Sequence, residues 1–149
     1  MSTRAFICYV DNDGNIRGTF NHWDGYPDWL GKKIVEVAEK KFIDNRGTNG
    51  VPNNVTIEQA LEAFIQVYIK GHPGGWNVFD EECYCHTPEY VLRDGFIDAT
   101  CLNNECFEMC YTYIIIPNEA KMEVYQGRHK LISVYDFKER KWTNINNND

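Results

Sequence analysis

The chain has 149 residues, 43% of them hydrophobic and 14% aromatic, and its formal net charge is −7. A chain of this length and composition buries enough apolar surface to form one globular domain rather than a disordered segment. The acidic balance argues against nucleic-acid binding through a basic surface, because such binding depends on displacing counterions from phosphates. No apolar run is long enough to cross a bilayer, and the first residues lack the pattern of a secretory signal. We therefore expect a cytoplasmic protein without membrane contact.

A hairpin and a helix are predicted at the start of the chain. Residues 4–10 (RAFICYV) favour a strand, Asp13-Gly14 is a hairpin signal, and residues 16–23 (IRGTFNHW) return as a second strand. Pro27 suits the first turn of a helix that should end near residues 44–45. Apolar residues at a spacing of three and four predict its buried stripe, which consists of Leu30, Ile34, Val37, Ala38 and Phe42.

A second helix is predicted over residues 57–70. Thr56 with Gln59 three residues later matches a capping box, in which each side chain bonds the other's backbone. Apolar residues cover nearly all faces of this segment, so we expect the helix to be largely buried.

The second half of the chain changes to strand-like periods. β-branched and aromatic runs occur at residues 90–95, 106–117, 121–127 and 130–137, and the last three are joined by short turns that predict an antiparallel meander. Residues 1–143 should form a single domain, and residues 144–149 a frayed tail. The fold class is α+β: an N-terminal β-hairpin, two helices and an antiparallel β-meander, with both helices on one face of the sheet.

The stretch TFNHWDGYP, residues 19–27, is the first candidate site. His22 and Asp24 could act as a general base and its orienting carboxylate, although in a strand they share a face without favouring a direct bond. The alternative is structural: Asp24 caps the helix, Gly25 supplies an unusual φ, Trp23 enters the core and His22 bonds a backbone group. Free amides at such a corner also suit an anion, and this favours binding over nucleophilic chemistry.

Thr3 and Arg4 should lie beside this corner once the hairpin folds back. An arginine there would add a bidentate contact to an anion, whereas the alternative is a surface arginine on an edge strand. No nucleophile motif or phosphate-binding loop accompanies these residues, and no cofactor is expected.

Cysteines form the second candidate site. Cys8 should be a core residue, whereas the other thiols, together with one imidazole, are candidate zinc ligands. Their spacing contains no C-x2-C pair, so buried or incidental reduced thiols are favoured over metal binding. The residues concerned are Cys83, Cys85, His86, Cys101, Cys106 and Cys110.

The opening of the chain resembles that of a family of small, mostly uncharacterised proteins of bacteriophages, bacteria and some fungi. Members begin M-G-T-R and continue to an H/Q-W-D-G/S-Y-P segment and a later glycine. Ser2 stands here in place of the usual glycine. Two later strands are also similar, at residues 111–115 (YTYII) and 123–127 (EVYQG). The matching N-terminal positions are Met1, Thr3, Arg4, His22, Trp23, Asp24, Gly25, Tyr26, Pro27 and Gly31. The resemblance implies a site shared by the two motifs and a phage or mobile-element origin, but no particular activity.

We therefore predict a small binding protein that engages a host protein or an anionic small ligand at the corner. The predicted ligand-binding residues are Thr3, Arg4, His22, Trp23, Asp24 and Tyr26. The alternative is a hydrolase or transferase that uses His22 and Asp24 as acid and base, with Arg4 as an anion clamp. A metal-stabilised structural protein is a third hypothesis, and the oligomeric state is left open.

Overall fold

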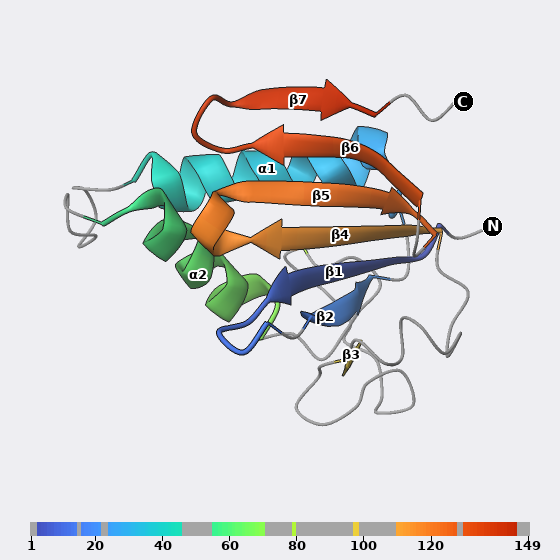
Figure 1. The fold of residues 1–149 in the computed structure, drawn as a ribbon, viewed down its shortest axis with the longest axis horizontal. Helices are drawn as coiled ribbons and strands as arrows, with labels where there is room; N and C mark the ends of the chain where they lie inside the picture. Colours follow the sequence, from blue (N-terminus) through green and yellow to red (C-terminus); the bar gives the residue numbers. More distant parts are fainter. Residues whose placement is uncertain are drawn as a thin grey trace.

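One mixed β-sheet with two helices on one of its faces forms the frame of the molecule (Figure 1). The computed structural model describes residues 3–14, 16–21, 24–45, 55–70, 79, 97–98, 110–127 and 130–145. The predicted α+β class is confirmed, with its N-terminal hairpin, two helices and antiparallel meander.

Seven strands build the sheet within the described residues, in the order β3-β2-β1-β4-β5-β6-β7. The hairpin turn at Asp13-Gly14 is confirmed, since Gly14 has φ +82° and its N–H donates to the Asp11 carbonyl. The predicted strand at residues 90–95 lies outside the described residues. The strands are β1 (Ala5–Val10), β2 (Ile16–Asn21), β3 (Ile97–Asp98), β4 (Tyr111–Ile116), β5 (Lys121–Gln126), β6 (Lys130–Asp136) and β7 (Lys141–Asn144).

The hairpin and the meander are joined by a parallel pairing of β1 with β4. The ladder runs from Ala5 opposite Tyr111 to Tyr9 opposite Ile115, while the other pairings of the sheet are antiparallel. β1 therefore lies between β2 and β4, in the interior of the sheet. Both faces of β1 are buried: Ala5 and Ile7 face the helices, and Phe6 and Cys8 face the other way.

The first helix is continuous over residues 27–43. Its middle is α-helical (α1, Lys32–Val37), and wider π-type turns flank it at Pro27–Gly31 and Ala38–Ile43. The predicted stripe is confirmed, with Leu30, Ile34, Val37 and Ala38 buried and Phe42 packed against the same core. The helix ends at Asp44, as predicted.

The second helix, α2 (Ile57–Tyr68), begins with the predicted capping box. Gln59 N–H donates to Thr56 Oγ1 over 3.1 Å, and Thr56 N–H donates to Gln59 Oε1 over 2.9 Å. The expected nearly complete burial is wrong. Val67 is 53% exposed, and Ala63 also faces solvent, because α2 packs on the core through one stripe. That stripe contains Ala60, Leu61, Phe64 and Ile65.

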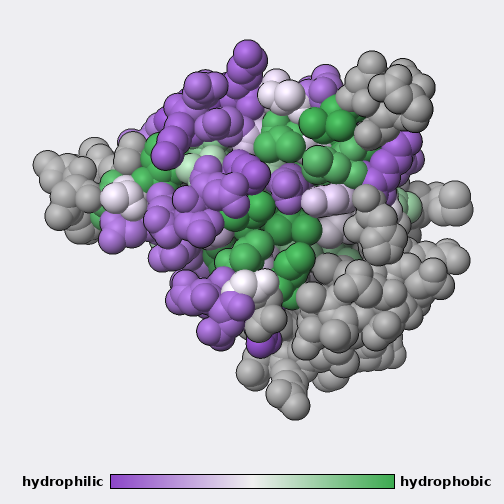
Figure 2. All heavy atoms as spheres, viewed as in Figure 1, coloured by the Kyte–Doolittle hydropathy of each residue, from purple (hydrophilic) through white to green (hydrophobic). Residues whose placement is uncertain are grey.

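Hydrophobic residues are buried on both faces of the sheet. The larger cluster lies between the sheet and the helices, and a smaller one contains Phe6, Cys8 and Ile114 on the opposite face. Figure 2 looks onto that opposite face, where hydrophobic residues gather over the middle strands between hydrophilic ones. The prediction that Cys8 is a core residue is confirmed, and burial raises the pKa of its thiol.

The C-terminal end of the sheet extends beyond the predicted domain boundary. Asn144 is the last residue of β7, and Ile145 N–H donates to the Ile132 carbonyl over 2.8 Å. Residues 144 and 145, assigned to a frayed tail, thus continue the sheet. Among the helices of the described segments, none is long and apolar enough to cross a membrane.

A polar cluster binds the first helix to β6 and to the turn between β6 and β7. The hydroxyl of Tyr135, on β6, donates to Glu39 Oε2 over 2.5 Å, and Arg140 Nε lies 3.8 Å from the same carboxylate oxygen. Arg140 also binds both carboxylate oxygens of Asp44, just past the helix end. Its left-handed φ of +55° directs the chain back from β6 into β7. The β6–β7 turn is therefore bound to the C-terminal end of the helix.

Tyr135→Phe should lower the free energy of unfolding by about 1–2 kcal/mol, because a half-buried carboxylate loses its hydroxyl donor. Urea denaturation measures this loss. In a double-mutant cycle with Glu39→Gln the two losses should not add, since both changes remove the same interaction. Strictly additive losses would show that the hydroxyl and the carboxylate do not stabilise one another.

Candidate functional site

The predicted corner lies against the start of β1. Ala5 pairs with Asn21 across the hairpin, and Gly25 N–H donates to the Thr3 carbonyl over 2.9 Å. The sequence-based expectation that residues 3–4 lie beside the corner is therefore confirmed for the backbone. Two of the predicted binding residues, His22 and Trp23, lie outside the described residues.

Neither Asp24 nor Gly25 has the role predicted for it. Asp24 takes the left-handed conformation, with φ +56°, whereas Gly25 is not among the residues of positive φ in the described chain. Gly25 is needed for space: a Cβ there would lie 2.7 Å from the Thr3 carbonyl oxygen and 2.8 Å from Ala5 Cβ. The helix cap predicted at Asp24 is wrong, because the capping position is Tyr26 and it makes no side-chain cap bond.

A buried tyrosine holds the corner from the sheet side. The hydroxyl of Tyr113, on β4, donates to the Gly25 carbonyl over 2.6 Å, and the ring is fully buried. Burial, with a smaller contribution from Tyr111 and Asp28, raises the pKa of Tyr113 well above its ordinary value. The hydroxyl therefore keeps its proton and remains a donor at neutral pH.

Beside this anchor lies an open concavity, which we call the sheet-end hollow. Its volume is about 620 Å³. It collects residues from the corner, the start of β1, the start of β4 and the β5–β6 connection. The described residues that line it are Thr3, Tyr26, Cys110, Tyr111, Gln126, Gly127 and Lys130.

Two backbone hydrogen bonds and one bond from a side chain hold the walls of the sheet-end hollow in place. Cys110 N–H donates to the Arg4 carbonyl over 3.0 Å, and Gly127 N–H donates to the Cys110 carbonyl over 2.7 Å. The Thr112 hydroxyl donates to the Gly127 carbonyl over 2.7 Å. Three segments that are distant in sequence are thus joined edge to edge, so the lining side chains project from a rigid frame.

The exposed lining is mostly apolar, and its only charge within the described residues is positive. Lys130 is the only charged side chain among the described lining residues, and Thr3, Tyr26, Tyr111 and Gln126 add hydrogen-bonding groups. Tyr26 is 41% exposed, so its ring offers an aromatic surface at the rim. An ammonium group beside hydroxyl donors suits a carboxylate or phosphate group.

The predicted residues contribute unequally to this hollow. Thr3 and Tyr26 line it, whereas Asp24 is exposed outside the described lining. Arg4 supplies its carbonyl to the frame, and its guanidinium joins no ion pair within the described segments. Lys130, Gln126 and Tyr111 were missed, because they reach the corner only through the successive pairings of β1 with β4, β4 with β5 and β5 with β6.

Cys110 is the one proposed thiol ligand that falls within the described residues, and its thiol is free and exposed. The other candidate zinc ligands lie outside the described residues; they are Cys83, Cys85, His86, Cys101 and Cys106. No group of three or more metal-binding side chains occurs in the part of the chain that the structure covers.

Comparison with protein-family models, curated proteins and solved structures finds no match to this chain. The chemistry of the sheet-end hollow is therefore argued from its own residues.

Tyr113→Phe should lower the free energy of unfolding by about 1–3 kcal/mol, because the buried Gly25 carbonyl loses this donor. Tyr125→Phe is the matched control, since that hydroxyl donates to Glu123 on the same strand and does not touch the corner. Thermal melts compare the two variants. Equal losses, or none at Tyr113, would mean that the hydroxyl does not anchor the corner.

Stability should fall steeply in alkali. Burial raises the pKa of Tyr113 and Tyr135, and burial with the Glu123 carboxylate raises the pKa of Tyr125 to about 12. Unfolded tyrosines titrate near pH 10, so above that pH the folded protein binds more protons than the unfolded chain. The contribution of these tyrosines to the free energy of unfolding should therefore be constant until the pH approaches about 10 and decline as pH rises toward 12. The buried Cys8 thiol, whose pKa is also raised by burial, adds to this decline from about pH 8.5. Urea midpoints measured across this range check the decline, and a flat profile would contradict it.

Proposed function

We propose that the protein binds a small organic anion in the sheet-end hollow. The single observation that carries the proposal is the lining itself: one ammonium group and several hydroxyl and amide groups around a concavity of about 620 Å³. In a chain of net charge −7, a described lining with a cation and no carboxylate creates a local preference for anions.

The residues have distinct roles in this proposal. Lys130 and the Thr3 hydroxyl contact the acidic group, and the rings of Tyr26 and Tyr111 cover the body of the ligand. The frame of backbone bonds keeps these groups in place before the ligand arrives, which reduces the entropy lost on binding.

We place a small molecule rather than the predicted host protein at this site, because the cation and the hydroxyl groups of the described lining surround one open concavity. Cytoplasmic location and a phage or mobile-element origin remain part of the proposal. A reducing compartment suits the free thiol of Cys110 at the rim. The enzyme alternative depends on His22, which lies outside the described residues.

Isothermal titration with inorganic phosphate, acetate and benzoate tests the proposal. Lys130→Gln should weaken every anion by about tenfold or more, as expected for a lost hydrogen bond to a charged group. Tyr26→Ala should weaken benzoate far more than acetate, because only benzoate has a ring for Tyr26 to cover.

The matched control is Lys141→Gln, which removes an exposed lysine from β7, outside the hollow's described lining. It should leave all three affinities unchanged. Equal weakening by both lysine variants would indicate a general charge effect. Absence of saturable binding to the wild-type protein would overturn the small-anion proposal, and so would capture of a host protein that depends on Lys130.

A further inference from the structure

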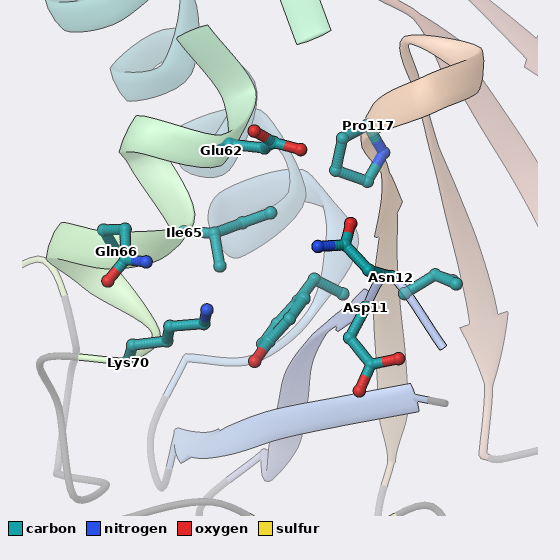
Figure 3. A pocket seen from close by; sticks show the side chains of 9 residues that line it. Asp11, Asn12, Glu62, Ile65, Gln66, Lys70 and Pro117 are labelled. Atoms are coloured by element: carbon teal, nitrogen blue, oxygen red, sulfur yellow. The ribbon is translucent and has the colours of Figure 1, made fainter. Parts of the chain in front are cut away.

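A second concavity, which we call the α2 pocket, lies at the other end of β1. It is formed where the end of β1 and the following turn meet α2 and the turn after β4 (Figure 3). Its volume is about 170 Å³, which limits it to a small molecule. Its lining includes Tyr9, Asn12, Glu62, Ile65, Lys70 and Pro117.

One wall of the α2 pocket is apolar and fixed. Ile65 and Tyr9 are 3% and 5% exposed, and Pro117 is also buried. These residues belong to three separate elements that pack on one core, so the wall cannot retreat from a ligand. Such a surface accommodates methylene groups.

Opposite charges stand on either side of that wall. Glu62 lies on α2 and Lys70 lies two residues past its last residue, Tyr68, and Figure 3 shows Ile65 between Glu62 and Lys70. Their positions differ by eight residues, so their Cα atoms are separated by about 12 Å along the helix axis. Lys70 Nζ lies 5.3 Å from the centre of the Tyr9 ring, a cation–π contact that directs the ammonium group toward the pocket.

The polar groups of the pocket are not equally available. Asp11 is engaged, because one carboxylate oxygen accepts from Asp13 N–H and the other from Arg17 Nε, 3.1 Å away. In contrast, the side chains of Asn12, Glu62 and Gln66 make no hydrogen bond or ion pair within the described chain. Glu62 is thus the available carboxylate of the described lining, and Lys70 is its available cation.

We infer that the α2 pocket binds a small zwitterion whose ammonium and carboxylate groups are separated by several methylenes, an ω-amino acid. Its carboxylate contacts Lys70, its ammonium contacts Glu62, and its methylenes lie on Ile65 and Pro117. The amides of Asn12 and Gln66 bond the two ends. An α-amino acid, in which both charges sit on one carbon, spans too little of the distance between Glu62 and Lys70.

This inference is independent of the anion site. The sheet-end hollow contains Thr3, which precedes β1, whereas the α2 pocket contains Tyr9 and Val10 at the end of that strand. The two described linings have no residue in common, so each can be tested while the other stays intact.

Titration with 5-aminovalerate, followed by calorimetry and by backbone amide shifts, tests the inference. A Kd of about 1 mM or tighter is expected, with shifts at the end of β1 and along the second half of α2. Glycine, pentylamine and valerate should each bind at least about tenfold more weakly, because each loses the charge spacing or one charged contact.

Two substitutions assign the ends of the ligand. Glu62→Gln should weaken 5-aminovalerate about tenfold or more while leaving valerate unchanged, and Lys70→Met should do the same while leaving pentylamine unchanged. Both residues are exposed on the surface of the helix segment, so both variants should fold, and a thermal melt verifies this. Glu58→Gln, an exposed position in the first turn of α2, is the matched control and should bind like the wild type.

The inference is overturned if 5-aminovalerate gives no saturable shifts at these residues. It is also overturned if valerate or glycine binds as tightly as 5-aminovalerate, or if Glu58→Gln weakens binding as much as Glu62→Gln.

Discussion

The parallel ladder that runs from Ala5 opposite Tyr111 to Tyr9 opposite Ile115 unites two parts of the chain that are otherwise local structures. On one side lies the hairpin of β1 and β2, and on the other the meander of β4 to β7. Neither part could bury both faces of its own strands. The pairing also brings Tyr113 under the corner and Lys130 beside Thr3, so the core and the sheet-end hollow both depend on it.

Features encoded by neighbouring residues were predictable from the sequence. The Asp13-Gly14 turn, the capping box at Thr56 and the stripe of the first helix each follow from a few adjacent side chains, and each is found. The partner of β1 was not predictable, because every apolar run of the second half could pair with an apolar strand. The over-estimate of α2 burial has a related cause: Val67 is apolar, but nothing in the neighbouring sequence reveals that it faces away from the core.

The corner shows how a correct motif can be assigned an incorrect mechanism. Aspartate and glycine are both common where φ is positive, so residue type alone did not decide which of Asp24 and Gly25 would turn the chain. The Thr3 carbonyl decides it, since the backbone passes too close for any Cβ at Gly25. Asp24 is then directed outward and away from the helix start. The predicted location of the site, beside Thr3 and Tyr26, was right. The cationic side chain that lines the hollow, however, is Lys130 rather than Arg4.

The position of β1 has a consequence for how the protein is made. β1 ends at Val10, yet its parallel partner begins at Tyr111, so β1 is synthesised long before that partner. Until Tyr111 has left the ribosome, the apolar side chains on both faces of β1, such as Ile7, are not fully buried. One edge of β1 also lacks the strand with which it forms hydrogen bonds. Closing so long a loop is slow, because its entropy is lost before the contacts form. The newborn chain thus carries an aggregation-prone strand until β4 has been synthesised.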